Sequence, residues 1–319
     1  MCSQKPAQHD QESNVSTPDR QACASDAQQH PCFSEQAAHH AARMHLPVAP
    51  ACNLQCRYCQ RRFDCSNESR PGVVSQLMTP EEALRHTQSV AARLPQLRVV
   101  GIAGPGDPLA NLPRVAATCA LVRQHFPELQ LCLSTNGLAL PEAMRTLMQL
   151  QVRHFTITIN TMDPVIGAEI YAWLYWKNRR RRGIEAARIL LEQQMIGLHS
   201  LVAHGCLVKI NTVLIPGIND GQIAEINRVV SAAGVFSHNI MPLISQPEHG
   251  TYYGVMGVRG PDDAQLQAAR ESCKGAARLM RHCQQCRADA VGMLFNQRTI
   301  PIQSEREMAR SGQRLARIG

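Results

Sequence analysis

The segment Cys52-Asn-Leu-Gln-Cys56-Arg-Tyr-Cys59 carries three cysteines with the spacing C-x3-C-x2-C. Three thiolates on one tight loop can bind three irons of a cubane iron–sulfur cluster. The fourth iron then has no protein ligand, so a small molecule can chelate it. A structural zinc site instead closes four ligands around one ion. The triplet therefore predicts a [4Fe–4S] cluster with one open corner.

Outward from this loop, short β-type runs alternate with helical patterns. The runs fall at residues 46–49, 97–102, 129–133, 153–159, 206–214 and 238–243, and the helical patterns at 80–94, 112–126, 141–150, 183–198, 219–233 and 262–282. Thr79 followed by Pro80 is a typical helix start. The alternation predicts an α/β fold with a parallel sheet and right-handed crossovers. Six units are too few for a closed eight-stranded barrel, so we expect an open partial (β/α)6 barrel of the TIM type, with the site at the carboxyl ends of its strands.

The chain divides into one large domain and two tails. Residues 1–30 are polar and aperiodic, which predicts a disordered tail. Residues 31–293 form the predicted core with its extensions, and residues 294–319 form a C-terminal tail. No apolar stretch approaches the ~20 residues of a membrane span, and the polar start lacks a secretory signal. We expect a cytoplasmic protein that does not bind a membrane.

The net charge is +8, and its sharpest cluster lies beside an aromatic stretch at residues 171–176. The cluster consists of Lys177, Arg179, Arg180, Arg181 and Arg182. A solvated helix start or an anion-binding loop explains it, and a lid or a partner surface would explain it too. No nucleic-acid-binding motif accompanies these cations, so we expect no nucleic-acid partner.

The chain has thirteen cysteines, an odd number, and they are grouped. Without a secretory signal, this pattern indicates metal or redox chemistry rather than disulfides. Cys2 and Cys23 lie in the tail, while Cys119 and Cys206 read as small buried hydrophobic residues. The six that remain beyond the triplet are Cys32, Cys65, Cys132, Cys273, Cys283 and Cys286.

These six cysteines admit two interpretations. Cys283-Gln-Gln-Cys286, with Cys273 upstream, could be part of a zinc ligand set. Alternatively, six thiols supply three ligands to each of two further cubanes, and a histidine could complete one of them. His45 immediately precedes the first predicted strand and should face the same region.

The cysteine triplet, with Tyr58 before its third cysteine, resembles the signature of the radical S-adenosylmethionine (SAM) superfamily. The resemblance implies that the amino and carboxylate groups of SAM chelate the open iron, and that one electron then cleaves SAM to a 5′-deoxyadenosyl radical. The turn with Gly104, Gly106 and Asp107 resembles the superfamily's glycine-rich turn, which meets the amino group of SAM. Polar residues near other strand ends suit ribose and carboxylate recognition, although each is equally explained as a turn or cap residue: Ser134, Asn136, Asn160 and Asn211.

A narrower resemblance covers about residues 30–293. It rests on His30-Pro-Cys-Phe-Ser-Glu35, His45-Leu-Pro-Val-Ala-Pro-Ala-Cys52, Phe63-Asp-Cys65-Ser-Asn-Glu68-Ser-Arg70-Pro-Gly72, Ile215-Pro-Gly-Ile-Asn-Asp220, Tyr253-Gly-Val-Met-Gly-Val-Arg-Gly260 and Arg281-His-Cys283-Gln-Gln-Cys286-Arg-Ala-Asp-Ala290. These motifs resemble the nitrogenase cofactor biosynthesis family NifB. The resemblance implies a radical SAM carbide synthase of lyase or transferase type that serves nitrogen fixation. Such an enzyme fuses two [4Fe–4S] clusters with a SAM-derived carbon and an added sulfur into the eight-iron precursor of the nitrogenase FeMo cofactor. One SAM donates a methyl group, and a second supplies the radical that abstracts hydrogen from it.

The same resemblance implies residue roles and partners. Cys52, Cys56 and Cys59 hold the radical cluster, and Glu68 and Arg70 handle protons or contact an anion, unless they form a structural salt bridge. The ligand pool for the two substrate clusters is Cys32, His45, Cys65, Cys132, Cys273, Cys283 and Cys286. The implied partners are cofactor scaffold and carrier proteins, an iron–sulfur cluster donor, and a reductant such as ferredoxin or flavodoxin. Many members carry a C-terminal carrier domain, and an end at Gly319 predicts a stand-alone form.

Two other functions stay open at this point. A different radical enzyme, such as a peptide or RNA modifier, would need one auxiliary cluster or a zinc site. A non-catalytic iron–sulfur scaffold or carrier would bind clusters without cleaving SAM.

Overall fold

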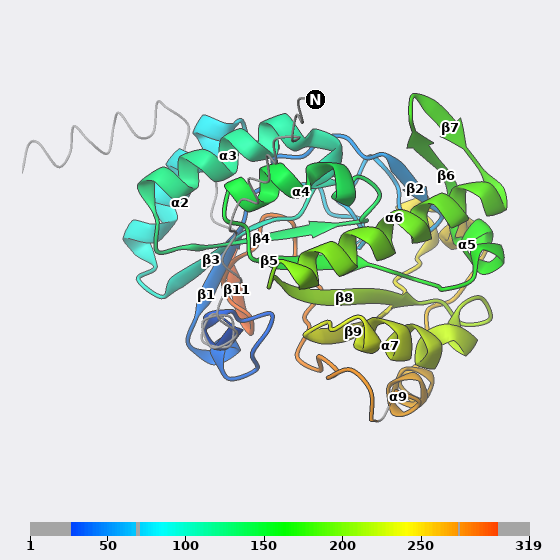
Figure 1. Cartoon of the computed structure of the whole chain (residues 1–319). Helices are drawn as coiled ribbons and strands as arrows, with labels where there is room; N and C mark the ends of the chain where they lie inside the picture. Colours follow the sequence, from blue (N-terminus) through cyan, green and yellow to red (C-terminus); the bar gives the residue numbers. More distant parts are fainter. Residues whose placement is uncertain (1–26, 68–70, 274, 299–319) are drawn as a thin grey trace, which may run out of the picture.

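The computed structural model describes residues 27–67, 71–273 and 275–298. Six parallel strands form a curled sheet in the order β1-β3-β4-β5-β8-β9 (Figure 1). Their bounds are β1 Ala42–His45, β3 Leu97–Ile102, β4 Gln130–Thr135, β5 His154–Thr158, β8 Leu207–Leu214 and β9 Ser237–Pro242. The strands do not close on themselves, so the sheet is the half-barrel that the sequence predicts.

Helices in the crossovers cover the convex face of the sheet (Figure 1). They are α2 Pro80–Arg93, α3 Leu112–His125, α4 Leu140–Gln149, α5 Pro164–Ile170, α6 Gly183–Ala203, α7 Ile223–Ala232 and α9 Asp263–Glu271. The predicted start of α2 is confirmed in detail: Thr79 and Glu82 form a capping box, with hydrogen bonds of 3.2 and 2.7 Å. Short turns complete the described fold: η1 Ala37–His39, η2 Pro108–Asn111, η3 Asp220–Gln222, η4 Pro247–His249 and α8 Tyr252–Val255.

The two faces of the sheet differ in polarity. Residues of a strand alternate between its faces, and the convex set, including Ile102, Leu131 and Ile157, packs in the main hydrophobic core. The concave set carries thiols, cations, hydroxyls and amides: Arg43, His45, Cys132, Ser134, Thr156, Lys209, Asn211 and Asn239. Parallel sheets are normally apolar on both faces. The polar concave face therefore marks where the site lies.

Three boundaries differ from the sequence-based expectation. The first strand ends at His45 instead of covering 46–49, because Pro47 has no N–H to donate to a ladder. The last helix ends at Glu271 rather than near 282, and Gly275 with φ +87° stands in the irregular segment that follows. Residues 294–298 are not all tail, since β11 (Asn296–Arg298) pairs with β10 (Val291–Met293), which pairs antiparallel with β1.

A second, three-stranded sheet was not anticipated. It contains β2 (Leu54–Cys56), β6 (Tyr171–Trp176) and β7 (Arg179–Arg181) in that order. β2 is part of the cysteine loop, and β6 is the aromatic stretch noted in the sequence. The aromatic and basic residues 171–181 therefore form a hairpin that is hydrogen-bonded to the cysteine loop.

Candidate functional site

The cysteine loop follows β1 and is fixed mainly through its backbone. Tyr175 N donates to Asn53 O at 2.8 Å, and Arg57 N donates to Ile170 O at 2.9 Å. The Gln55 side-chain amide donates to the carbonyls of Cys56 and Cys59 at 3.0 and 2.8 Å. These bonds hold the loop through main-chain atoms, which leaves the three thiols available as ligands.

The electrostatics of these thiols suit an iron–sulfur cluster. Burial, together with the neighbouring Asp107 carboxylate, raises the pKa of Cys52 to about 12, and burial followed by the neighbouring thiols raises that of Cys56. Buried thiols become thiolates when a bound metal compensates their charge. Among the described residues, no three His, Cys, Asp or Glu converge closely enough to hold a single metal ion. Three thiols on one short loop can each bind a separate iron of a cubane.

The glycine-rich turn after β3 packs directly against the cysteine loop. Asp107 N donates to Ala51 O at 2.8 Å, and a Cβ on Gly106 would come within 2.0 Å of that same carbonyl oxygen. Only glycine permits this approach. The Asp107 carboxylate accepts hydrogen bonds from Asn136 N (2.6 Å) and Thr135 Oγ1 (3.0 Å). Asp107 therefore joins the ends of β3 and β4, and Gly104, with φ +121°, lies in the same turn.

Asn136 reaches the loop with its side chain. Its amide donates to Asn53 Oδ1 at 2.8 Å and lies 3.8 Å from Cys52 Sγ. Of the four strand-end residues expected to recognise SAM, Asn136 is the one whose side chain contacts Cys52, and Ser134 lies in the pocket described below.

A hydrogen-bonded chain connects Tyr58 with the concave face. Tyr58 donates to Asn67 Oδ1 (2.6 Å), Asn211 donates to Asn67 O (3.2 Å), and Asn239 donates to Asn211 Oδ1 (3.0 Å). Asn160 Nδ2 donates to Tyr58 Oη at 2.7 Å, and Asn160 Oδ1 accepts from Val213 N at 2.9 Å. Both polar atoms of the Asn160 side chain are thus engaged inside the protein, which favours a structural role for it.

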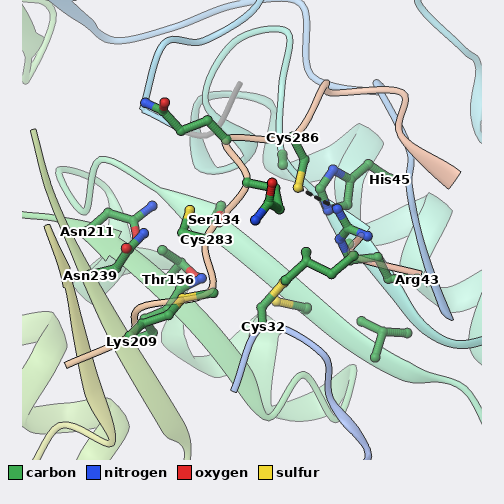
Figure 2. A pocket seen from close by; sticks show the side chains of 18 of the residues that line it. Cys32, Arg43, His45, Ser134, Thr156, Lys209, Asn211, Asn239, Cys283 and Cys286 are labelled. Carbon is green, nitrogen blue, oxygen red and sulfur yellow. Dashed lines mark hydrogen bonds between the residues drawn. The ribbon is translucent and has the colours of Figure 1, made fainter. Parts of the chain in front are cut away.

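A pocket opens on the concave face of the half-barrel (Figure 2). Four of the predicted cluster-ligand cysteines line it together with His45. The thiols of the lining belong to Cys32, Cys132, Cys283 and Cys286. Polar side chains of the strands complete it: Arg43, Ser134, Thr156, Lys209, Asn211 and Asn239. The N-terminal loop, the sheet and the C-terminal segment all contribute. His282 Nε2 lies 3.1 Å from Pro31 O, and this contact brings the loops of Cys32 and Cys283 together.

Arg43 is the central charge of this pocket. Its side chain is fully buried, and one guanidinium nitrogen donates to Cys286 Sγ while another donates to Gly292 O at 3.2 Å. Burial opposes the charge, but Cys286 and Cys32 raise the pKa of Arg43 above its ordinary value. Lys209 is also buried in the lining. Two buried cations favour an anionic occupant.

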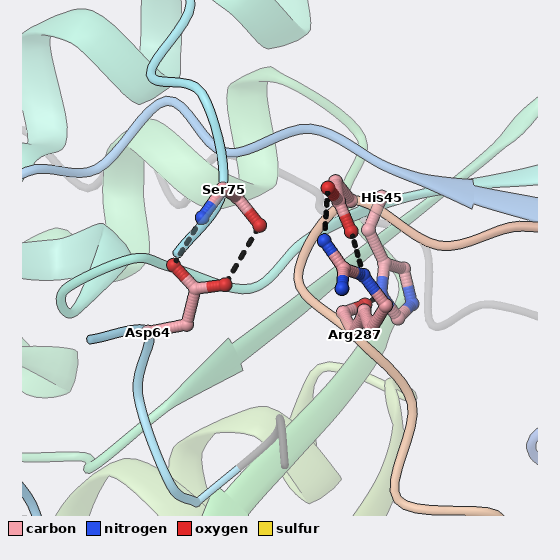
Figure 3. A network of polar contacts seen from close by, with 5 residues as sticks. His45, Asp64, Ser75 and Arg287 are labelled. Carbon is pink, nitrogen blue, oxygen red and sulfur yellow. Dashed lines mark hydrogen bonds and ion pairs between the residues drawn. The ribbon is translucent and has the colours of Figure 1, made fainter. Parts of the chain in front are cut away.

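His45 has the geometry of a metal-ligating imidazole. Its Nδ1 lies 3.1 Å from Arg287 O, and because a carbonyl only accepts, Nδ1 carries the hydrogen and Nε2 keeps its lone pair. Burial, reinforced by Arg43, lowers the pKa of His45 to about 3, so the ring is neutral. A Cβ on Gly101 would lie 2.9 Å from the ring, so this glycine makes room for it. Arg287 is itself held by Asp289, and Ser75 contacts Asp64 nearby (Figure 3).

The remaining predicted residues lie elsewhere. Cys65 is half-buried, and desolvation, followed by the nearby Cys59 and Cys52, raises the pKa of its thiol. Cys273 does not line the pocket; it packs in the main core, and its thiol lies 3.4 Å from Ala269 O. Glu68 and Arg70 lie outside the described residues. Cys119 and Cys206 are buried, as expected.

Sequence reasoning missed Arg43, Lys209 and Asn67. A usable signal existed for Arg43, which stands two residues before His45 and therefore on the same face of the strand. Lys209 stands in the same relation to Asn211. Asn67 acts mainly through long-range contacts, which a local pattern does not reveal.

Solved structures of other proteins share the fold. SuiB of Streptococcus suis bound to S-adenosylmethionine is 13% identical, with a TM-score of 0.52 over 80% of this chain and 54% of that chain. SuiB bound to its precursor peptide SuiA is 12% identical, with a TM-score of 0.53 over 76% and 49%. At this identity the likeness concerns the fold alone.

The radical SAM superfamily model matches residues 46–230, so the half-barrel with its cysteine loop defines a radical SAM protein, a class that uses a [4Fe–4S] cluster and SAM. The FeMo cofactor biosynthesis protein NifB of Herbaspirillum seropedicae is 56% identical over 277 residues, and that of Rhodobacter capsulatus is 58% identical over 269 residues. These matches cover 87% and 84% of this chain, which therefore belongs to the NifB family. The matches span 53% and 60% of the two relatives. Within the described ranges, no helix has the length and apolar character needed to cross a membrane.

Proposed function

We propose that this chain is a carbide synthase that fuses two [4Fe–4S] substrate clusters with a SAM-derived carbon and an added sulfur into an eight-iron precursor of the FeMo cofactor. The observation that carries the proposal is the pocket itself. It gathers four thiols, a neutral imidazole and two buried cations on the concave face of the half-barrel. A radical enzyme with an organic substrate has no need for so many soft ligands in its substrate cavity.

Cys52, Cys56 and Cys59 would hold the resident cluster, which would supply the electron for cleavage of SAM. Gly104, Gly106 and Asp107 shape the wall beside it, and Asn136 supports the cysteine loop, because its side chain donates to Asn53 Oδ1 and accepts from Leu138 N. Asn211 belongs to the chain that leads from Tyr58 into the pocket. That chain gives the cysteine loop and the substrate pocket a fixed relative position.

The ligand pool separates into two groups by position. Cys32, Cys283 and Cys286 surround Arg43, whose pKa all three raise. His45 and Cys132 flank Gly101 on neighbouring strands, in the register His45↔Gly101↔Cys132. We assign one substrate cubane to the first group and the other to His45 and Cys132, and Cys65, which lies beside the cysteine loop, stays a ligand prediction from the family resemblance. Cys273 and Glu68 with Arg70 stay predictions from the family resemblance.

Thiol substitutions test this assignment. Cys56→Ala should abolish SAM cleavage and leave the auxiliary clusters visible by EPR. The double variant Cys283→Ala/Cys286→Ala should keep SAM cleavage but stop assembly of the eight-iron product. Cys119→Ala, buried in α3, is the matched control and should do neither. An eight-iron product from the double variant would contradict the assignment.

A second candidate is a radical enzyme with another substrate, because the half-barrel resembles SuiB, whose structure holds a precursor peptide. The two functions differ in products. In the carbide synthase, methyl transfer from one SAM gives S-adenosylhomocysteine, and hydrogen abstraction by the radical from a second SAM gives 5′-deoxyadenosine. Formation of 5′-deoxyadenosine without S-adenosylhomocysteine would contradict the proposal of a carbide synthase. We further propose that the partners are cofactor scaffold and carrier proteins, an iron–sulfur cluster donor and a reductant.

A further inference from the structure

The hairpin of β6 and β7 lies at the edge of the molecule, where it extends past α6 (Figure 1), and its sequence is rich in basic and aromatic residues. Its exposed cations are Lys177, Arg179 and Arg180, with Arg182 directly after β7. Arg181 forms an ion pair with Glu185 at 2.8 Å. Within the described part of the chain, the other four cations have no ion pair. They therefore form a positive surface that the protein itself does not neutralise.

One face of the small sheet points outward. Tyr175 lies opposite Arg180, and Trp173 lies on the same face two residues away. Leu174 on the opposite face is fully buried, whereas Tyr175 is 51% exposed. The Arg180 guanidinium lies 4.6 Å from the centre of the Trp173 ring. Trp, Tyr and Arg dominate binding energy at protein interfaces, and the stacking holds Arg180 in position before a partner arrives.

This outer face leads directly to the cysteine loop. Gln55 of β2 pairs with Trp173 of β6, so their side chains share the face. The Gln55 amide donates to the carbonyls of Cys56 and Cys59 at 3.0 and 2.8 Å. A protein docked on Trp173 would thus be separated from the backbone of two radical-cluster ligands by one side chain.

We propose that this surface, made of Trp173, Tyr175, Lys177, Arg179, Arg180 and Arg182, is the docking site of an acidic one-electron carrier protein. The inference rests on the proposed function, which needs an electron at the cluster of the cysteine loop. The reduced carrier loses one electron and that cluster gains it, with no bond or proton transferred. Complementary charge steers such a partner and speeds its association, and salt screens the effect.

The test uses the reconstituted holoprotein and a reduced plant-type [2Fe–2S] ferredoxin as the acidic carrier. Stopped-flow absorbance follows ferredoxin reoxidation at several ionic strengths. The test variant is Arg179→Glu/Arg180→Glu. The matched control is Arg93→Glu/Arg145→Glu, which makes the same charge change at exposed positions on α2 and α4. SAM cleavage driven by dithionite, a small reductant that needs no docking site, is measured in parallel.

We expect the hairpin variant to accept electrons from ferredoxin about tenfold or more slowly at low salt. The difference should shrink as salt rises, and dithionite-driven SAM cleavage should be equal in all three proteins. Equal ferredoxin rates in the three proteins would overturn the docking site alone. The docking site would also be overturned if the hairpin variant lost binding to a labelled RNA oligonucleotide but kept its rate of electron transfer. That result would identify a nucleic-acid surface. A wild-type protein that fails to cleave SAM with dithionite would instead reject the proposed function itself.

Discussion

Arg43 has the most unusual environment of the side chains that line the pocket. A fully buried guanidinium is costly unless an anion compensates it, and its Nε atom has no hydrogen-bond partner. Its contact with Cys286 is a strong pairing only when that sulfur is an anion, as the proposed binding to iron would make it. The residue is therefore suited to the cluster-loaded protein rather than to the empty one.

Replacing Arg43 by Met should affect the loaded and empty proteins in opposite directions. The metal-free variant should be as stable as the wild type or more stable, by up to about 4 kcal/mol, because a buried charge is removed. The reconstituted variant should bind less iron while keeping the EPR signal of the cysteine-loop cluster. Urea unfolding and iron analysis measure the two effects, with Arg43→Lys as the charge-conserving control. A variant that lost stability without metal and kept full iron loading would show that Arg43 is only structural.

Gly106 tests the contact between the glycine turn and the cysteine loop. In Gly106→Ala, the new Cβ would overlap the carbonyl of Ala51, which is backbone and cannot turn away. We expect a loss of about 1–3 kcal/mol in the free energy of unfolding and weaker SAM binding by calorimetry. Gly221→Ala is the control, because its Cβ would meet nothing within 4 Å. Equal SAM affinity in both variants would separate the turn from cofactor recognition.

At the scale of elements, His238 on β9 ties the sheet to α7. Asn227 Nδ2 donates to His238 Nδ1 at 3.0 Å, so the ring hydrogen is on Nε2, which donates to Thr212 Oγ1 at 2.9 Å. Asn227 Oδ1 accepts from Ala277 N, which fixes the orientation of that amide. A second proton on the His238 ring would be on Nδ1 and would therefore point at the side-chain N–H group of Asn227.

This geometry predicts a pH dependence. Burial lowers the pKa of His238 to about 4, against 6.5 in the unfolded chain. The neutral His238 ring makes its full contribution to the free energy of unfolding above pH 6.5. This contribution is lost as the pH falls towards 4, because the unfolded chain takes up the proton first. The loss amounts to about 3 kcal/mol. Urea unfolding of the metal-free protein between pH 7 and 4.5 should show a shallower decline for His238→Gln. Parallel profiles would mean that His238 is not responsible.

The sequence predicts the strands and helices of the barrel better than the side-chain contacts that form the site inside it. Periodicity located five of the six parallel strands and most helices because each buries a continuous apolar face on the convex side, but it placed the first strand four residues too late. It could not find β2 or β10, which are short and are defined by partners far away in the chain. Likewise, the cysteine triplet is a local signal, whereas the meeting of Cys32 with Cys283 and Cys286 depends on the fold of both termini. Arg43 was overlooked because the first predicted strand began at residue 46, after this arginine.

At the scale of the whole molecule, the fold places two kinds of site in sequence along the half-barrel. The cysteine loop lies at the carboxyl ends of the strands, and the pocket lies deeper on the concave face, linked to it by Tyr58, Asn67 and Asn211. Three [4Fe–4S] clusters in one chain would contain about twelve irons. Iron analysis after anaerobic reconstitution should approach that count, and about four to eight irons, or bound zinc, would favour a different radical enzyme.

The most direct measurement follows the methyl carbon of SAM. The reconstituted protein is incubated under reduction with SAM labelled in its methyl group, and the iron–sulfur product is separated from protein and nucleoside. We predict S-adenosylhomocysteine and 5′-deoxyadenosine in similar amounts, with the label in the iron–sulfur product of the wild type and not in that of Cys283→Ala/Cys286→Ala. Deoxyadenosine with no label in the iron–sulfur fraction would contradict the carbide synthase.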